Sequence, residues 1–402
     1  MRRFGTQWRS RSKKKTETAQ KEEATKLYEE GRKLLFGLDG SKVDVKRGVE
    51  LLQKAADVGS LDAKGELAFR RVTLHWGIND YVPETEKELD AARKQAFEAA
   101  LAGNPFALLT LSICAGREEW YGVEDKLKQE KLEEESKQYG LAGLQALKKR
   151  AEEGDVRAKT WLFVLGGANL AEDANDDAEQ AKRWLREAGE SRSAEAAFLL
   201  GFHPPVDHAW EEPEKKEDYQ ALIRAAEAGL PEAMLTAGRF YLMGAALYDE
   251  NAPAPELIIA KDEDKGVELL SKAADAGLMS AALFLAKYYE YGGDFDGSER
   301  EPDPEKAIEW YIKATECETA KKWSGDELGQ IMVKIGRYYL DRLYKTLESK
   351  KIYDQKVAKE ARKWFYRAET EGYGSERWIK ELDEIKQGVE EEGKEMGITI
   401  IE

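Results

Sequence analysis

The sequence predicts an all-α protein in which helix-turn-helix units stack into a right-handed solenoid. The strings KRGVELLQKAADVG at 46–59 and DKGVELLSKAADAG at 264–277 are nearly identical, although 218 positions (264 − 46) separate them. Apolar residues also recur at the spacing of one helix face along most of the chain. A helix pair of this length cannot bury its apolar face alone, so copies are expected on both sides.

The unit is most complete at 277–318. Its first helix carries small and aromatic residues on one face, namely Ala281, Leu285, Ala286, Tyr289 and Gly292. Its second helix does the same with Ala307, Trp310, Tyr311 and Ala314. Pro304 lies at the first turn of this second helix, behind Asp303 as a candidate N-cap. Small residues on such faces allow neighbouring helices to approach closely.

Turns between successive units divide the chain regularly. They fall at Gly59, Gly103, Gly154, Arg192, Gly229, Gly277, Glu318 and Gly372. This spacing predicts about eight helix pairs. Tryptophans occur at equivalent positions of three second helices, Trp184, Trp310 and Trp364. These large side chains are expected to fill the gaps between pairs.

The chain divides into a basic N-terminal arm at 1–18, a repeat solenoid at 19–375 and a C-terminal segment at 376–402. The last segment begins with a helix that is apolar on one side only, as the cap of an open solenoid requires. It ends in the apolar, β-like string GITII at 397–401. We expect this string to fold back on the chain or to pair with a partner.

The repeated pattern A-x-x-x-L-G-x-x-Y-x-x-G, a loop, then D-x-x-K-A-x-x-W-Y-x-K-A-A-x-x-G resembles the Sel-one-like repeat, a relative of the tetratricopeptide repeat. The resemblance covers residues 20–375 and is closest at 230–277 and 278–318. The units that start near Asp62, Phe106 and Val156 depart from it. The resemblance implies a non-catalytic scaffold, adaptor or assembly factor that binds protein partners on its concave face and inserted loops.

Composition excludes several classes of protein. The net charge is −16, which argues against general affinity for nucleic acids or membranes. No apolar run approaches the roughly 20 residues of a membrane span. Cys114 and Cys317 lie far apart, so a reducing compartment is expected. These features predict an intracellular protein, either cytoplasmic or mitochondrial.

The first 16 residues differ from the rest, because seven of them are Arg or Lys and none is acidic. Candidate contact residues in this arm are Arg2, Arg3, Trp8, Arg9 and Arg11. Three interpretations stay open: a mitochondrial transit peptide, an arm that binds RNA or another polyanion, and a solvated tail. The second predicts an alternative function as a structural subunit of a large ribonucleoprotein, such as a mitochondrial ribosome.

Insertions distinguish one repeat protein from another, and four occur here, at 75–89, 117–140, 202–218 and 245–264. Candidate partner-binding residues in them are aromatic residues and histidines, namely Trp76, Tyr81, His203, His208, Trp210 and Tyr248. The loop at 202–218 is rigidified by prolines, and the loop at 245–264 surrounds an apolar ELII.

Metal sites and catalysis are not expected. His203, Asp207 and His208 could suggest a zinc site, but zinc needs three or four ligands and no cysteine lies nearby. The acidic turns at 173–184 and 294–305 lack the glycine that a calcium loop requires. No phosphate-binding glycine loop or nucleophile elbow is present. The sequence therefore predicts no cofactor, no metal and no enzymatic activity.

Overall fold

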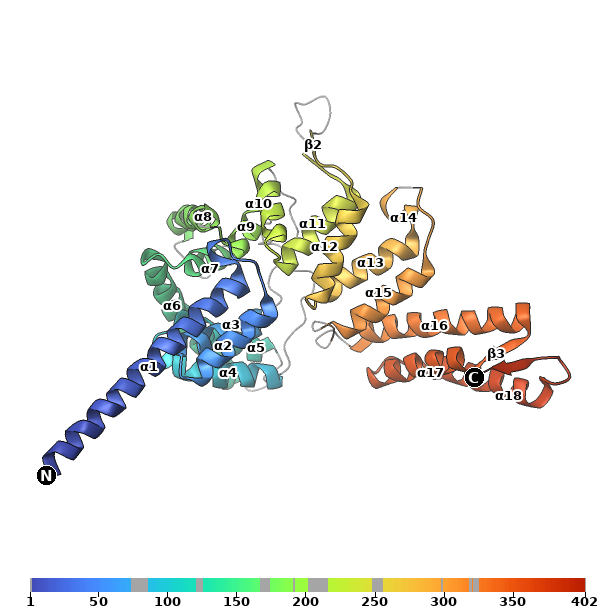
Figure 1. Cartoon of the computed structure of the whole chain (residues 1–402), viewed down its shortest axis with the longest axis horizontal. Helices are drawn as coiled ribbons and strands as arrows, with labels where there is room; N and C mark the ends of the chain where they lie inside the picture. Colours follow the sequence, from blue (N-terminus) through green and yellow to red (C-terminus); the bar gives the residue numbers. More distant parts are fainter. Residues whose placement is uncertain are drawn as a thin grey trace. The chain divides into compact units, whose positions relative to one another are not determined.

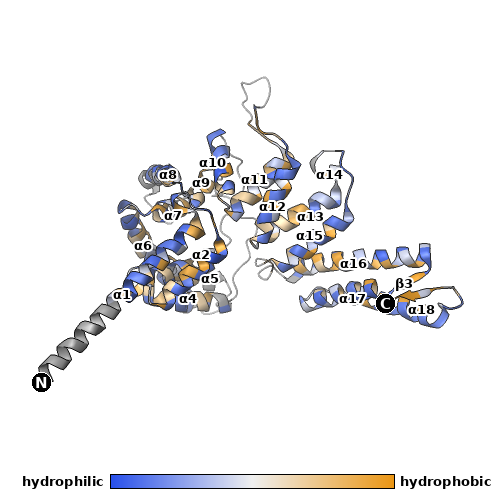
Figure 2. Ribbon diagram, viewed as in Figure 1, coloured by the Kyte–Doolittle hydropathy of each residue, from blue (hydrophilic) through white to orange (hydrophobic). Residues whose placement is uncertain are grey.

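The computed structural model describes residues 2–73, 86–120, 126–166, 174–190, 192–201, 216–247, 256–297, 299–317, 320 and 325–401. These residues are predominantly helical, so the all-α prediction is confirmed (Figure 1). They form two compact units, unit 1 at Met1–Lys261 and unit 2 at Asp262–Glu402. In Figure 2 most helices carry a hydrophobic stripe beside a hydrophilic one, as stacked amphipathic helices do.

Helix pairs follow one another along unit 1. The first helices of its pairs are α1 (Arg2–Phe36), α3 (Leu61–Thr73), α5 (Pro105–Trp120), α7 (Val156–Gly166), α9 (Ala194–Gly201) and α11 (Pro231–Met243). The second helices are α2 (Val45–Asp57), α4 (Glu86–Leu101), α6 (Lys126–Glu152), α8 (Ala174–Glu190) and α10 (Lys216–Glu227). A 3₁₀ turn, η1 (Leu38–Gly40), joins α1 to α2, and strands β1 (Ala245–Leu247) and β2 (Glu256–Ile259) follow α11.

Unit 2 continues the same alternation. Its helices are α12 (Glu263–Asp275), α13 (Met279–Tyr291), the short α14 (Gly293–Asp296), α15 (Pro304–Glu316), α16 (Gly325–Lys350), α17 (Gln355–Thr370) and α18 (Glu376–Glu392). Its strands are β3 (Ile352–Asp354) and β4 (Thr399–Ile401). Within the described ranges α13 packs on α15 and α16 packs on α17. The remaining predicted pair, α11 and α12, is divided between the two units.

The predicted turns are confirmed at seven of eight positions. A left-handed backbone occurs at Gly59, Gly103, Gly154, Arg192, Gly229, Gly277 and Gly372. At the first of them Gly59 N–H donates to Ala56 O (3.0 Å) and Ser60 N–H to Ala55 O (2.9 Å), which closes the helix end. The eighth position, Glu318, lies outside the described residues.

Arg192 is a non-glycine residue in a turn that favours glycine, with φ at 58°. Left-handed backbone costs an L residue about 1–2 kcal/mol, part of which the larger unfolded-state entropy of glycine offsets. We therefore expect Arg192→Gly to raise the free energy of unfolding by up to about 1 kcal/mol in denaturant titrations. The reverse change Gly103→Arg, at a turn where a Cβ meets nothing within 4 Å, should lower it. A destabilised Arg192→Gly variant would show that the Arg192 side chain stabilises the turn.

An aspartate caps the second helix of several pairs. Asp44, Asp262 and Asp303 each accept a hydrogen bond from the backbone N–H three residues on, at 2.9, 3.0 and 3.0 Å. These bonds satisfy amide groups that have no partner within the helix. The predicted N-cap at Asp303, followed by Pro304, is confirmed. The first residue of the D-x-x-K-A pattern therefore starts each of these helices.

The tryptophans are less uniformly buried than the sequence predicts. Trp364 is buried, whereas Trp184 and Trp310 are only half-buried. In all three helices the following residue is buried, namely Leu185, Tyr311 and Phe365. The apolar stripe of each second helix therefore centres on the residue after the tryptophan, and the tryptophan flanks it.

The apolar string at the end of the C-terminal segment folds back on the chain, which is one of the two alternatives expected from the sequence. β4 pairs with β3 in parallel, with Ile352 opposite Thr399. In the cap helix α18, Leu382 is buried and Trp378 stacks on Phe365 with ring centroids 5.6 Å apart. The insertion at 245–264 differs from the predicted loop, because β1 and β2 pair antiparallel there.

The first helix also extends further than expected. Helical periodicity in the sequence begins at Ala19, but α1 begins at Arg2. The predicted boundary after residue 18 therefore falls inside a helix. In the part of α1 whose side chains are described, Tyr28, Leu35 and Phe36 are buried.

Candidate functional site

Most candidate residues named from the sequence lie where the structure gives no description. Trp76, Tyr81, His203, His208, Trp210 and Tyr248 all fall outside the described residues. The backbone of Arg2, Arg3, Trp8, Arg9 and Arg11 belongs to α1, and their side chains are outside the described part. The partner-binding predictions at these positions therefore stay predictions.

Two searches concern the described residues alone. In the described ranges, no three His, Cys, Asp or Glu side chains gather as ligands for one metal ion. His203, Asp207 and His208, which the sequence analysis rejected as a metal site, lie outside these ranges, whereas residues 174–184 of the acidic turn at 173–184 belong to α8. No described helix is both long and apolar enough to cross a membrane.

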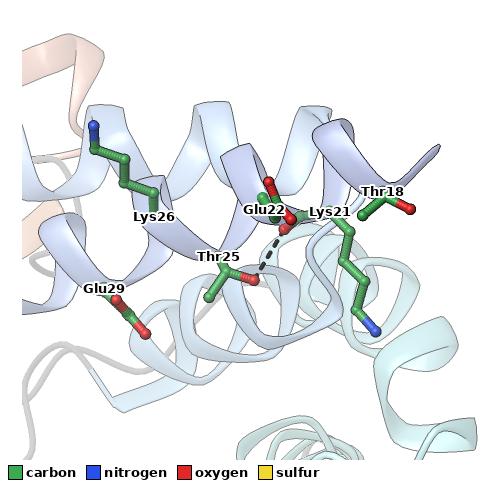
Figure 3. Close-up of a pocket in the computed structure, with 6 residues that line it drawn as sticks. All are labelled: Thr18, Lys21, Glu22, Thr25, Lys26 and Glu29. Carbon is green, nitrogen blue, oxygen red and sulfur yellow. Dashed lines mark hydrogen bonds between the residues drawn. The ribbon is translucent and has the colours of Figure 1, made fainter. Parts of the chain in front are cut away.

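A hollow runs along α1 (Figure 3). The described residues lining it are polar and all lie on this one helix, namely Thr18, Lys21, Glu22, Thr25, Lys26 and Glu29. Thr25 Oγ1 donates to the Lys21 carbonyl within the helix, at 2.9 Å. Two lysines balance two glutamates, and no apolar side chain is present to hold a ligand. This hollow is therefore not the functional site we favour.

A stronger candidate is a tyrosine face on unit 2, formed by Tyr289 of α13 with Tyr338 and Tyr339 of α16. The adjacent rings Tyr288–Tyr289 and Tyr338–Tyr339 share one geometry, with centroids 5.5 Å apart and an interplanar angle of 78°. Both pairs come from the same YY motif in a first helix. Tyr288 is buried, and the three tyrosines of the face are half-buried.

Charged side chains from the second helices surround this face. Lys306 Nζ lies 5.0 Å from the Tyr289 ring centroid. Burial raises the pKa of Tyr289, and Lys306 partly opposes this rise. Burial also raises the pKa of Tyr338, with Glu305 adding to it. Asp303 contributes to the rise in pKa of both Tyr289 and Tyr338.

A hydrogen-bonded triad supports the helices beneath the tyrosine face. Tyr311 Oη donates to Glu290 Oε2 at 2.6 Å, and Lys334 Nζ donates to Glu290 Oε1 at 2.8 Å. Lys334 Nζ also lies 3.2 Å from Tyr311 Oη. Since these residues come from α15, α13 and α16, the triad fixes three helices to one another. Its bonds limit the movement of α13 and α16, the two helices that carry the tyrosine face.

Unit 1 contains a second cluster, an ion network centred on Arg157 at the start of α7. Arg157 Nε donates to Glu66 Oε2 of α3 at 2.8 Å, and Nη1 donates to Glu195 Oε1 of α9 at 2.6 Å. The side chains of Arg157 and Glu66 are 2% and 0% exposed. The Arg157 guanidinium also lies 3.5 Å from the Phe36 ring centroid. Removal from water strengthens such charged contacts and makes an unpaired member costly.

Helix α1 supplies a second arginine to the ion network. Arg32 Nη1 and Nη2 donate to Asp155 Oδ2 and Oδ1, at 3.1 and 2.8 Å. Asp155 also accepts from the backbone N–H groups of Arg157 and Ala158 at 2.9 and 3.1 Å. Burial raises the pKa of Glu66, with Arg157 and Arg32 opposing the rise. Burial acts to raise the pKa of the half-buried Asp155, yet Arg32 and the backbone donors hold it below the usual value.

The lowered pKa of Asp155 predicts acid sensitivity. Its contribution to stability is fully present above the unfolded pKa of about 3.9 and is lost as pH falls through the lower folded pKa. We expect Asp155→Asn to lower the free energy of unfolding at pH 7 by about 2–3 kcal/mol. The gap from the wild type should close as pH falls below about 4 in denaturant titrations. A gap that stays constant with pH would contradict this assignment.

Comparison of the sequence with protein families identifies its repeats. A family model described as "Sel1 repeat" matches residues 31–60, 173–193, 257–278, 280–318 and 354–373. The chain contains Sel1 repeats, as the sequence resemblance predicts. The matched Sel1 repeats include the N-caps Asp44, Asp262 and Asp303 described above. The span from 61 to 172 matches no Sel1 model, in agreement with the departures near Asp62, Phe106 and Val156.

Three solved structures are similar to this chain over much of its length. A Sel1 repeat protein from Oxalobacter formigenes is 18% identical to this chain, with a TM-score of 0.38. The match covers 92% of this chain and 89% of that protein. The protective antigen c5321 of uropathogenic Escherichia coli has 21% identity and a TM-score of 0.36, with coverages of 91% and 72%. Immunity protein Pa5087 from Pseudomonas aeruginosa has 16% identity and a TM-score of 0.37, with coverages of 65% and 84%. A comparison with curated proteins gives no match.

Sel1 repeat proteins are generally non-catalytic scaffolds that bind other proteins. The Sel1 repeats of this chain carry a feature that our sequence analysis missed, the ion network. A signal was present, because Arg157 and Glu195 each stand three residues after a turn between repeats. Ser280 occupies the same register in the repeat that matches best. Opposite charges at one register of successive repeats predict ion pairs between first helices.

Proposed function

We propose that this chain is a non-catalytic scaffold or adaptor, and that the tyrosine face of unit 2 contacts its protein partner. The observation that carries the proposal is the recurrence of the same tyrosine pair on α13 and α16, of which Tyr289, Tyr338 and Tyr339 are half-buried. Tyrosine offers a large rigid ring and a polar hydroxyl, and it is enriched at the centres of protein interfaces. Tyrosines that recur at the spacing of the repeat suit contact with an extended peptide or with one face of a helix.

The surroundings of the face support a protein partner over a nucleic acid. Lys306 and Arg342 lie among Glu305, Glu309 and Glu360, which act on the same tyrosines. Mixed charges of this kind form the polar rim of a protein interface, whereas a phosphate backbone requires a surplus of basic groups. We also propose that the concave surface and the loops at 75–89, 202–218 and 245–264 contact protein partners.

The test is capture of partners by tagged protein, followed by mass spectrometry. We expect the double variant Tyr289→Ala/Tyr338→Ala to lose the captured partner, because a central aromatic contact is worth about 2 kcal/mol or more, about 30-fold in Kd. The matched control is Tyr366→Ala, which removes an exposed tyrosine of α17, 52% exposed. Circular dichroism should show that both variants stay folded. Equal capture by the double variant and the wild type would refute this surface.

The basic start supports a second candidate, attachment to a ribonucleoprotein. Seven of the first 16 residues are basic and none is acidic, whereas the rest of the chain is acidic. This composition suits binding of the first 16 residues to RNA or another polyanion. Binding to RNA should fall by one to two decades over a fourfold rise in salt if about three phosphates are neutralised. Loss of this binding on deletion of residues 1–16 would support the candidate. A fusion of the same segment to a reporter tests mitochondrial targeting.

A further inference from the structure

Repeat 1, defined as α1 and α2 with their connection at 37–44, has two kinds of contact within unit 1. Toward α3 it packs through apolar side chains, including Tyr28, Leu35, Phe36, Leu52, Ala55, Ala56, Ala63 and Leu67. Toward α9 and α11 it makes main-chain hydrogen bonds (Figure 1). Gly40 N–H donates to Arg192 O at 3.1 Å, and Val43 N–H donates to Ala228 O at 2.7 Å. The connection of repeat 1 therefore crosses to turns that lie far along the chain.

The second contact is polar. Besides these main-chain bonds, it includes Ala194 N–H donating to Gly37 O at 3.3 Å and the bonds from Arg32 to Asp155. Water can replace the neutral main-chain bonds, whose net contribution is about 0.5–1.5 kcal/mol each, so the charged pair of Arg32 with Asp155 is the main bond that holds this side closed. The apolar contact with α3 would persist when the polar one opens, because burial of apolar area holds it. Repeat 1 is thus held to α3 by apolar contacts and to α9 and the turn before α11 by polar contacts.

Arg32 lies in a site that is built for a basic group. Its guanidinium binds both oxygens of Asp155, and its Nε lies 3.4 Å from Glu66 Oε1. Glu66 Oε1 and the Tyr28 hydroxyl are buried and have no hydrogen bond among the described residues. Burying such groups without partners is costly, so the site has unused capacity for further donors. Without Arg32, the carboxylates Glu66, Asp155 and Glu195 would face Arg157 with a surplus of negative charge.

We propose that repeat 1 is a latch, in which Arg32 occupies within the chain a carboxylate site that a basic segment of a protein partner takes when the latch opens. This inference rests on the proposed function as a scaffold, and it adds a second surface and its regulation. A bidentate pair between a guanidinium and a carboxylate is specific for arginine. The partner segment is therefore rich in arginine, and Arg32 competes with it.

A disulfide lock tests the latch. A Cβ built at Gly40 lies 3.7 Å from Arg192 Cβ, within the range of disulfides. Both native cysteines are buried, so Gly40→Cys/Arg192→Cys forms one new pair. The probe is a fluorescent oligo-arginine peptide, measured by anisotropy. We expect about tenfold or stronger binding after reduction than in the oxidised form. Equal affinity in both forms would overturn the proposal.

Point variants keep the test decisive if the cysteine pair fails to oxidise. Arg32→Gln removes the competing guanidinium and should raise the affinity for oligo-arginine, about tenfold. The matched control is Arg47→Gln, which removes an exposed arginine of α2 and should leave the affinity unchanged. Asp155→Asn in the Arg32→Gln background should abolish the gain. An Arg32→Gln protein that is folded by circular dichroism and binds no more tightly than Arg47→Gln would refute the latch.

The test of the latch can be distinguished from the partner-capture test of the tyrosine face. Tyr289 and Tyr338 belong to unit 2, whereas Arg32 and Asp155 belong to unit 1. Loss of partner capture in the tyrosine double variant, with no effect of the disulfide lock, would sustain the proposed function and refute the latch. Conversely, a redox-dependent gain of oligo-arginine binding stands even where the tyrosine variants capture the same partners as the wild type.

Discussion

Arg157→Leu is expected to lower the free energy of unfolding of unit 1 by about 3–5 kcal/mol, the usual cost of breaking a buried ion pair. The change leaves Glu66 without its closest partner, and the Glu66 side chain is 0% exposed. It also leaves Glu195 with the Trp161 indole, whose Nε1 donates to Glu195 Oε1 at 3.1 Å. Denaturant titration followed by fluorescence of Trp161 and Trp184, both in unit 1, would measure the loss.

The double variant Glu66→Leu/Arg157→Leu separates loss of pairing from loss of packing. Replacing both members of a buried pair by apolar residues is often nearly neutral, because neither charge is left unpaired. We therefore expect the double variant to recover most of the loss. The matched single control is Arg47→Leu, since Arg47 is exposed and, among the described residues, forms an ion pair with Glu50. A loss as large in the double variant as in Arg157→Leu would mean that the aliphatic stem of Arg157 is the main stabilising feature.

Phe365→Ala is expected to cost about 3–5 kcal/mol in unit 2, as for other truncations of buried aromatic residues. Phe365 is 0% exposed, and its ring stacks on Trp378 of the cap helix α18. A Cβ built at Gly336 would lie only 2.6 Å from Phe365 Cε1, so Gly336 leaves space for this ring. The truncation removes contacts to both α16 and α18. Increased hydrogen exchange in α18 should accompany the loss of stability.

Two neighbouring changes calibrate this prediction. Tyr366→Ala removes a side chain that is 52% exposed and should stay within about 0.5 kcal/mol of the wild type. Trp310→Ala, at the half-buried tryptophan of α15, should cost less than Phe365→Ala. If Trp310→Ala proves the costlier, then the tryptophan, and not the residue after it, is the main packing residue of each second helix.

The sequence by itself determined the helix pairs, their turns and their caps, because these features depend on local chemistry. Left-handed turns favour glycine, and Gly59 and Gly277 mark them at equivalent points of two nearly identical strings. An aspartate side chain caps the helix that follows it, and Asp303 does so within its own turn. Periodicity alone placed Ala281 and Leu285 on the buried face, where the structure has them.

Only the tertiary structure decided which distant residues meet. Arg32 and Asp155 are 123 positions apart in the chain, and neither lies in a motif that names the other as partner. Their contact depends on how several helix pairs curve together within unit 1, and small rotations at each pair accumulate along such an array. The same reason explains why Trp310 is half-buried while Tyr311 is buried, since a shift of one residue along a helix changes which side chain faces the neighbouring helix. Local chemistry therefore defines the repeat, and the accumulated geometry of the repeats creates both the ion network and the tyrosine face.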